Sequence, residues 1–436
     1  MTAKGLFAVE TLGCRFNRYE TAEIDYELER AGYVRAAVGQ TPDLVVINTC
    51  TVTDRSDYQC RAAIRKVKER HPDALVVVAG CYAETNPAEV AAMGEVDLIL
   101  GNAEKFDVAL QVARLDRGRK SPLVAVGAQA DGALPVRGVE RLEGRTNAYL
   151  NIQSGCDEVC AFCVVRLARG KNRSADPDQV VAQVGRMADA GVKELVLAGI
   201  NLGDYGKGGG PPFAFLVERI LRETKIPRIR FSSLNPNTIE PALIDLMAAD
   251  SRLMPHLHIP LQSGCDATLA RMRRPYTTDD YERLVERIVA ALPAVGLGAD
   301  VLTSFPGETE EEFETTRQFI ERLPFTTLHV FTFSPREGTE AWAMKVGGVP
   351  KDEARRRTGA LKTIASGKNH AARKAAVGAV VPVLVETRRD REGMLRGFTP
   401  TYLPVTITGD DRLKGEIAPV RIVAAGESRL LGEATP

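Results

Sequence analysis

The chain has 436 residues, 44% of them hydrophobic and 26% charged, so we expect an ordinary globular protein of two or three domains. Its 57 Lys and Arg balance 57 Asp and Glu, so no overall field draws it towards a polyanion, and any nucleic-acid contact must come from local basic patches. No run of about 18 apolar residues occurs and the first residues do not resemble a signal peptide, so we expect a cytoplasmic protein without a membrane span.

Short apolar runs alternate with helical patterns over residues 1–118, which predicts an open parallel α/β sheet covered by helices on both faces. Cys14, Cys50 and Cys81 each follow the C-terminal end of one predicted strand. Those strand ends share one edge of such a sheet, so the three thiols should converge there. Cys60 falls inside a predicted helix, and we expect no role for it. The predicted strands are "LFAVETLGC" (6–14), "DLVVINTC" (43–50), "ALVVVAGCY" (74–82) and "VDLILGN" (96–102).

Residues 119–146 lose this alternation and gather Gly and Pro, which is typical of a linker. The alternation returns over residues 147–375, where six strand-like runs separated by helices predict a partial (β/α)6 TIM-type barrel. In the acidic run "PGETEEEF" of this segment, Thr309 and Glu312 are predicted to form a capping box that opens a helix. The six runs are 148–155, 193–202, 228–235, 256–264, 295–307 and 326–335.

Residues 376–436 read as strands and turns without helix, which predicts a small β-barrel of a type that often holds nucleic acid. Three basic stretches are candidate nucleic-acid patches, although each also fits an ordinary solvated surface. They are "RLARGKNR" (166–173), "RMRRPY" (271–276) and the segment 351–374.

The stretch "IQSGCDEVCAFC" (152–163) places three cysteines on one short loop, with the spacing C-x3-C-x2-C. Three such thiols can hold three corners of an iron–sulfur cube and leave one iron open for a chelating small molecule. A zinc site with a distant fourth ligand is the alternative, since the chain contains five histidines.

This loop, after the first strand of a six-unit barrel, resembles the signature of the radical S-adenosylmethionine superfamily. The resemblance implies that Cys156, Cys160 and Cys163 hold a [4Fe–4S] cluster. Its open iron would bind S-adenosylmethionine, whose reductive cleavage gives a radical that abstracts hydrogen from substrate. It also implies that Phe162 lies beside the adenine and that Gly199 and Asn201 of "AGIN" lie near the methionine amine. Ser232 and Gln262 are further cofactor-binding candidates, because they follow predicted barrel strands, where such barrels build their active sites.

"TLGCRFNRYE", "INTCTV", "AGCYAE", "HIPLQSG" and "SPREGT" are similar, in order, to the radical S-adenosylmethionine methylthiotransferases. The resemblance implies a second [4Fe–4S] cluster on Cys14, Cys50 and Cys81, which carries the sulfur to be inserted. All six cysteines are thus catalytic and metal-binding candidates. One S-adenosylmethionine would methylate the sulfur and a second would supply the radical. The resemblance also implies that the C-terminal segment with "GFTPTYLPV" is a TRAM-like domain that binds RNA. The expected partners are a tRNA anticodon stem-loop, a reductant such as flavodoxin or ferredoxin, and a sulfur donor.

Within that family "TLGCRFNRYET" and "TPTYLPV" most resemble the branch that adds a methylthio group to C2 of N6-threonylcarbamoyladenosine beside the anticodon. The alternatives are the branch acting on isopentenyladenosine, the branch acting on an aspartate of a ribosomal protein, and a non-catalytic metal-binding RNA-binding protein. Arg166, Ser304 and Glu84 depart from the family pattern. Arg166, Arg169 and Arg336 are candidate substrate contacts.

Overall fold

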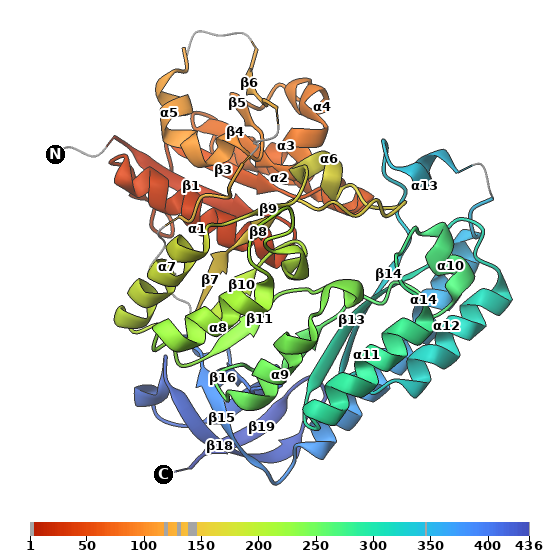
Figure 1. Cartoon of the computed structure of the whole chain (residues 1–436). Helices are drawn as coiled ribbons and strands as arrows, with labels where there is room; N and C mark the ends of the chain where they lie inside the picture. The colour runs from red at the N-terminus through yellow and green to blue at the C-terminus, as the bar shows by residue number, and fades with distance from the viewer. Residues whose placement is uncertain (1–3, 117–120, 129–131, 138–145, 345–346, 436) are drawn as a thin grey trace.

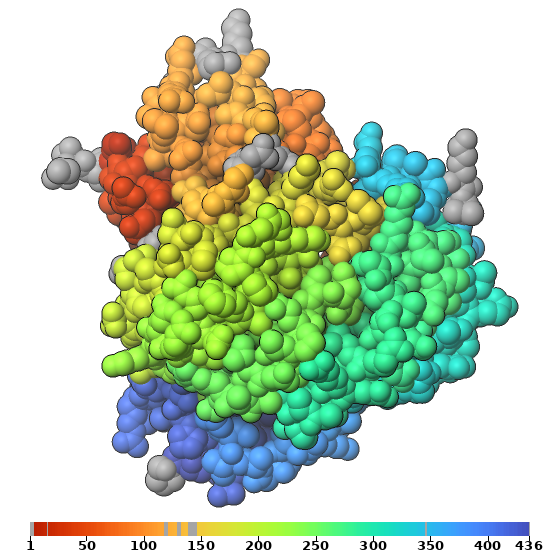
Figure 2. Space-filling view, in the orientation of Figure 1, coloured from red at the N-terminus to blue at the C-terminus, as the bar shows by residue number. Residues whose placement is uncertain are grey.

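The computed structural model describes residues 4–116, 121–128, 132–137, 146–344 and 347–435. Three bodies follow one another along the molecule (Figure 1). The N-terminal sheet domain, coloured red to orange, sits at one end, a half-open barrel of strands and helices lies in the middle, and a small β-barrel, coloured blue, closes the other end. The space-filling view shows the three packed directly against one another (Figure 2).

The N-terminal domain is a six-stranded parallel sheet in the order β2-β1-β3-β4-β5-β6, which confirms the predicted parallel α/β fold. Successive side chains of a strand point to opposite faces, so Val45 and Ile47 join one apolar cluster, whereas Leu44 and Val46 join another. The strands are β1 Leu6–Thr11, β2 Val34–Arg35, β3 Leu44–Thr49, β4 Leu75–Gly80, β5 Leu98–Leu100 and β6 Leu123–Ala125. The helices are α1 Arg15–Arg30, α2 Asp54–Arg70, α3 Cys81–Thr85, α4 Pro87–Ala91 and α5 Val108–Ala113.

Strand β6 comes from the segment 119–146, in which only a linker is expected. It pairs in parallel with β5 through Leu98 and Leu123, so the sheet continues past residue 118. A three-residue strand of this kind has too little period to be seen in the sequence. Within the expected linker, residues 119–120, 129–131 and 138–145 lie outside the described residues.

All six predicted barrel strands form, in two parallel sheets ordered β7-β10-β11 and β12-β13-β14. An isolated parallel bridge from Ile229 to Leu253 lies where the two sheets meet, so the strands follow chain order around a partial barrel. The strands are β7 Asn147–Asn151, β10 Glu194–Ala198, β11 Ile229–Phe231, β12 His256–His258, β13 Gly296–Thr303 and β14 Thr327–Thr332, with a short hairpin of β8 Gln153–Ser154 and β9 Arg173–Ser174. The helices are α6 Val165–Arg169, α7 Pro177–Asp189, α8 Phe213–Glu223, α9 Pro241–Ala249, α10 Asp266–Arg271, α11 Thr278–Ala291, α12 Glu310–Arg322, α13 Glu340–Ala343 and α14 Lys351–Ala375.

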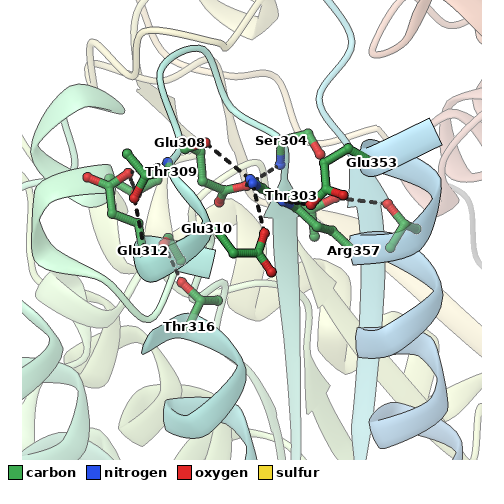
Figure 3. Close-up of polar contacts among 12 residues, drawn as sticks. Thr303, Ser304, Glu308, Thr309, Glu310, Glu312, Thr316, Glu353 and Arg357 are labelled. Carbon is green, nitrogen blue, oxygen red and sulfur yellow. Dashed lines mark hydrogen bonds and ion pairs between the residues drawn. The ribbon is translucent and has the colours of Figure 1, made fainter. Parts of the chain in front are cut away.

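The acidic segment after β13 is structural (Figure 3). Thr309 and Glu312 form the predicted capping box of α12. Glu308 is buried, accepts a hydrogen bond from the backbone N–H of Ser304 at 2.7 Å and pairs with Arg357 of α14 at 3.0 Å. Burial raises the pKa of Glu308, and Arg357 opposes that rise. This network therefore holds the long helix α14 against the barrel.

The C-terminal domain is a closed barrel in the order β15-β16-β17-β19-β18, as predicted. It docks on the side of the partial barrel where strands begin, because Arg228 and Arg230 flank the start of β11 and donate to the carbonyls of Pro382 (2.7 Å) and Pro400 (3.0 Å). Tyr402 stacks on Phe398, with ring centroids 4.9 Å apart, in the same contact. The segment "TPTYLPV" is thus a domain-docking loop. The strands are β15 Val380–Val385, β16 Leu395–Phe398, β17 Pro404–Thr408, β18 Ile417–Ala425 and β19 Leu430–Ala434.

No helix in the described parts of the chain is both long and apolar enough to cross a bilayer.

Candidate iron–sulfur and cofactor site

The loop carrying Cys156, Cys160 and Cys163 joins β8 to α6 at the C-terminal end of the barrel strands. Backbone hydrogen bonds fix it at both ends: Cys156 N–H donates to the Gly170 carbonyl at 3.1 Å, and Cys163 N–H donates to the Cys160 carbonyl at 3.1 Å. Gly155 has φ +74°, and a Cβ there would lie 1.8 Å from a backbone oxygen. Only glycine therefore fits at the start of this loop.

The three thiols of this loop lie close enough to influence one another. Burial raises the pKa of Cys156 to about 11 and that of Cys163 to about 12, and the neighbouring Cys160 adds to both shifts. Arg274, in the stretch "RMRRPY", places Nη1 2.9 Å from the sulfur of Cys160. This half-buried guanidinium donates a hydrogen bond to the sulfur and so helps to orient it within the loop.

The predicted cofactor-binding residues Gly199, Asn201 and Ser232 lie together at the ends of β10 and β11. Gly199 N–H donates to Ser232 Oγ at 3.0 Å, and that hydroxyl donates back to the Gly199 carbonyl at 3.1 Å. Asn201 is buried, and its Oδ1 accepts from Asn235 N–H at 3.1 Å. Its Nδ2 has no partner among the described residues, so a buried donor is available to an acceptor group on a ligand.

Phe162 and Gln262 lie at the other half of the barrel mouth. Phe162 packs edge-on against Phe305, which follows β13, with ring centroids 6.4 Å apart. Gln262 follows β12 and has φ +65°, a left-handed conformation that is uncommon for a residue with a side chain. The mouth is thus formed by strand ends from both three-stranded sheets, as in barrel active sites.

The structure brings Cys14, Cys50 and Cys81 together at one edge of the N-terminal sheet, as their strand-end positions predict. Burial raises the pKa of Cys50 to about 11, and the thiols of Cys14 and Cys81 contribute to that rise. A Cβ on Gly13 would lie 2.6 Å from the Cys50 sulfur, so a glycine is needed for this approach. Cys60 is buried in α2 and donates to the Cys50 carbonyl at 3.3 Å.

Helix α6 connects the two cysteine sets directly. It starts two residues after Cys163, and its last turn packs against α3, whose first residue is Cys81. Asn102 Nδ2 donates to the Ala168 carbonyl at 2.7 Å and also approaches the Cys81 sulfur at 3.7 Å. A five-residue helix is only about 7.5 Å long, so a short segment joins the loop of Cys163 to the neighbourhood of Cys81.

The three arginines predicted to contact substrate have different environments. Arg169 is buried and pairs with Glu20 of α1 at 2.8 Å. Arg336 is also buried; it donates to Thr51 Oγ1 at 2.7 Å and pairs with Asp57 of α2. Both therefore join the barrel to the N-terminal domain, whereas Arg166 on α6 is exposed and has no ion-pair partner among the described residues.

The two basic stretches nearest the site contain mostly paired arginines. Arg271 pairs with Glu312, Arg273 pairs with Glu340 at 2.9 Å, and Arg274 contacts Cys160. The sequence alone does not identify Arg274 as a site residue. A run of arginines usually lies on a solvated surface, and partners that are distant in the chain cannot be recognised from the sequence. The sequence also does not identify Asn17, Glu20, Asn102 and Lys105, which have no recognisable motif.

The donor chemistry of both sets fits iron–sulfur clusters. Each set offers three cysteine sulfurs, the ligands that such clusters take. Among the residues that the structure describes, no three His, Cys, Asp or Glu side chains are grouped to share a single metal ion. A four-iron cube does not need such a group, because each cysteine sulfur binds a different iron.

Two family models match the chain. Residues 6–101 match the uncharacterized protein family UPF0004, and residues 150–320 match the radical SAM superfamily. The first match covers Cys14, Cys50 and Cys81, and the second covers the loop of Cys156 to Cys163.

Curated relatives align over nearly the whole chain. The threonylcarbamoyladenosine tRNA methylthiotransferase MtaB of Bacillus subtilis (strain 168) is 37% identical, over 96% of this chain and 94% of its own. The tRNA-2-methylthio-N(6)-dimethylallyladenosine synthase of Anaeromyxobacter dehalogenans (strain 2CP-C) is 35% identical, over 97% and 93%.

A solved structure supports the fold. The radical S-adenosylmethionine methyltransferase TsrM from Kitasatospora setae has a TM-score of 0.55 and 16% identity, covering 76% of this chain and 75% of its own. The radical SAM match implies S-adenosylmethionine and a [4Fe–4S] cluster as cofactors. Together with the full-length relatives, the two family models show that the chain belongs to the radical S-adenosylmethionine methylthiotransferase family and is a transferase.

Proposed function

We propose that the protein adds a methylthio group to C2 of N6-threonylcarbamoyladenosine in tRNA, with one [4Fe–4S] cluster on Cys156, Cys160 and Cys163 and a second on Cys14, Cys50 and Cys81. The observation that carries the proposal is the convergence of two separate three-cysteine sets on either side of α6. A single set suffices for radical chemistry, whereas inserting sulfur into a C–H bond also needs a place to hold the sulfur. The short path between the sets suits that division of labour.

The chain's own residues have distinct roles in this proposal. When bound, the clusters and S-adenosylmethionine supply the electron, the radical precursor, the methyl group and a site for sulfur. Asn201 offers a buried, unpartnered amide N–H to the polar end of S-adenosylmethionine, and Gly199 and Ser232 fix the neighbouring strand ends. Phe162 and Gln262 border the same mouth. Arg169 and Arg336 hold the N-terminal domain over it.

The choice of threonylcarbamoyladenosine is supported by the relative at 37% identity that bears this name, and by Arg166. The threonyl group carries a carboxylate, for which an exposed, unpaired guanidinium near the cysteine loop is a suitable partner. The isopentenyl group is apolar and would gain no binding energy from the Arg166 guanidinium. Relatives named for dimethylallyladenosine keep that nucleoside as the second candidate substrate.

Two partners follow from this chemistry. Radical generation consumes electrons, which a small reducing protein such as flavodoxin or ferredoxin would deliver, and each turnover consumes one sulfur atom, which requires a sulfur donor. The tRNA would be met in the cytoplasm. The C-terminal β-barrel, as a TRAM-like domain, would hold tRNA away from the modified base, because it docks on the opposite end of the barrel from the cysteines.

Nucleoside mass spectrometry tests the proposed function. Total tRNA from the source organism lacking the gene should have lost 2-methylthio-N6-threonylcarbamoyladenosine and kept its unmodified precursor. The wild-type gene should restore the modified nucleoside, and a Cys50→Ala gene should not. Loss of the methylthio mark from isopentenyladenosine instead would transfer the assignment to that substrate. A purified, anaerobically reconstituted chain should contain about eight irons.

A further inference from the structure

Lys105 and Arg169 both pair with the carboxylate of Glu20, close to the auxiliary cysteines (Cys14, Cys50 and Cys81). Glu20 pairs with Arg169 at 2.8 Å and with Lys105 at 2.7 Å. Glu20 and Lys105 come from the N-terminal domain and Arg169 comes from α6, and all three side chains are at least nine-tenths buried. Such a group leaves one buried positive charge without an acidic partner. Buried charges are costly unless something of opposite sign lies nearby.

A second carboxylate in the neighbourhood does not supply the missing negative charge. Glu23, one turn along α1, is buried, and burial raises its pKa to about 8, so it is mostly protonated at neutral pH. Glu20 differs, because burial alone would raise its pKa but Arg169 and Lys105 hold it at about 2.

Glu84 also lies near Lys105 and Arg169, but burial raises its pKa, and its carboxylate accepts from the backbone N–H of Asn102 at 2.7 Å. Burial lowers the pKa of Lys105, and Glu20 opposes that shift. Among the described residues, Glu20 is therefore the carboxylate that pairs directly with both cations.

Two asparagine amides lie between these cations and the cysteine sulfurs. Arg169 donates to Asn17 Oδ1 at 3.0 Å, and the same oxygen accepts from the thiol of Cys14 at 3.8 Å. Asn17 Nδ2 also holds the Thr49 carbonyl at 2.8 Å, one residue before Cys50.

The second of these amides is Asn102. Lys105 donates to Asn102 Oδ1 at 2.8 Å, and Asn102 Nδ2 approaches the sulfur of Cys81 at 3.7 Å. Both cations are thus one amide away from a thiol of the auxiliary set.

We propose that Arg169 is a positioning residue of the auxiliary site, which, with Lys105, supplies the buried positive charge that offsets a negatively charged iron–sulfur cluster on Cys14, Cys50 and Cys81 and raises its reduction potential. The inference rests on the second cluster of the proposed function. An oxidised [4Fe–4S] core has two positive charges and its three thiolates have three negative ones, so the sum is one negative charge, which matches the excess at the site. Reduction adds a further electron, which nearby positive charge favours.

The position of Arg169 also links the two cysteine sets. Arg169 lies on α6, which follows the loop of Cys156 to Cys163, whereas the charge that it offsets belongs to the cluster on Cys14, Cys50 and Cys81. The full charge compensation of the auxiliary site therefore exists only when the barrel and the N-terminal domain are docked.

The test uses the full-length chain with Cys156, Cys160 and Cys163 changed to Ala, so that only the auxiliary cluster is present. Iron content and the reduction potential, followed by electron paramagnetic resonance, are measured for this protein and for four further substitutions in it. We expect about four irons per chain. Arg169→Gln should make reduction about tenfold less favourable, which is ~59 mV for one electron. Glu20→Gln should shift the potential in the opposite direction.

Arg169→Lys keeps the charge and should stay near the parent potential, although the two-pronged contact with Glu20 is lost. Lys171→Gln, which removes an exposed positive charge two residues after Arg169, is the matched control and should leave the potential near the parent value. General damage to the site would not produce shifts of opposite sign for Arg169→Gln and Glu20→Gln. Normal iron content with equal potentials in these two variants would overturn the inference and leave the proposed function standing, whereas absence of iron in the parent would overturn both.

If Arg169→Gln alone fails to retain iron, Lys105→Gln provides the same measurement from the other cation, with the same expected direction. An unchanged potential in that variant would contradict the inference.

Discussion

Arg274 Nη1 lies 2.9 Å from the sulfur of Cys160, although the two residues are 114 positions apart in the chain. The same guanidinium donates to Tyr276 Oη and to Asn235 Oδ1, each at 3.1 Å, so its plane is fixed on three sides. Burial alone would lower the pKa of Arg274, but Tyr276 and Cys160 raise it above its ordinary value. The middle cysteine of the loop is thereby oriented by a residue from outside the motif.

Arg274→Gln should reduce cleavage of S-adenosylmethionine to 5′-deoxyadenosine by about tenfold or more, because a hydrogen bond to a charged group is worth ~1.5–3 kcal/mol. The rate is measured under strong reductant with iron content held equal. Arg273→Gln is the control, since this neighbouring arginine is exposed and, within the described part of the chain, pairs with Glu340 alone. Equal rates in the two variants would show that Arg274 has no effect on the cluster loop.

Cys50→Ala should abolish methylthio transfer and leave part of the cleavage of S-adenosylmethionine, because the loop of Cys156 to Cys163 stays intact. Cys160→Ala should abolish both activities. Cys60→Ala is the matched control, a buried thiol beside Cys50 that lies in helix α2, and it should keep both. Products are quantified by mass spectrometry. Parallel loss of both activities in Cys50→Ala would contradict separate roles for the two cysteine sets.

Arg166→Ala should weaken binding of an anticodon stem-loop bearing threonylcarbamoyladenosine by about tenfold, which corresponds to ~1.4 kcal/mol. A stem-loop with plain adenosine at that position should be affected much less, because it lacks the carboxylate. Lys171→Ala, an exposed cation close in the chain, controls for general phosphate attraction. If Arg166→Ala weakens both RNAs equally, Arg166 contacts the RNA backbone and does not read the threonyl group.

Glu23→Gln should change how stability depends on pH. Since burial raises the pKa of Glu23 from 4.5 to about 8, its protonated form stabilises the fold, fully below pH 4.5, and this contribution is lost as the pH rises through 8. Gln is neutral throughout, so the variant should gain stability over the wild type as the pH rises from 4.5 to about 8, by at most about 1.4 kcal/mol per pH unit.

The urea unfolding midpoint of the full chain, under reducing conditions, measures this effect of Glu23→Gln. Glu29→Gln, an exposed residue on the same helix, should show no such dependence. A difference from wild type that stays constant with pH would mean that Glu23 is already ionised in the folded protein.

The sequence was sufficient to predict much of the architecture. Continuous apolar runs separated by helical patterns mark the parallel strands, and cysteines that follow those runs must share an edge. The six barrel strands and the capping box of α12 follow from equally local signals. Strand β6 does not, because three residues pair with β5 without any period of their own.

The polar framework of the site could not be predicted, because it depends on distant pairs. Arg169 meets Glu20 across 149 positions, and Arg336 meets Asp57 across 279. An exposed and a buried arginine look alike in a sequence, so Arg166 and Arg169 received the same predicted role. "TPTYLPV" likewise reads as a substrate-branch signature, yet its Tyr402 packs in the interface between the barrel and the C-terminal domain.

The substrate of the enzyme can be decided by giving the reconstituted protein two stem-loops at once. One RNA carries threonylcarbamoyladenosine beside the anticodon and the other carries isopentenyladenosine; S-adenosylmethionine, sulfide and a reductant are in excess, and nucleosides are analysed by mass spectrometry. We expect a methylthio group on threonylcarbamoyladenosine, together with S-adenosylhomocysteine and 5′-deoxyadenosine. Methylthiolation of isopentenyladenosine alone, or of neither RNA while S-adenosylmethionine is still cleaved, would contradict the proposed function.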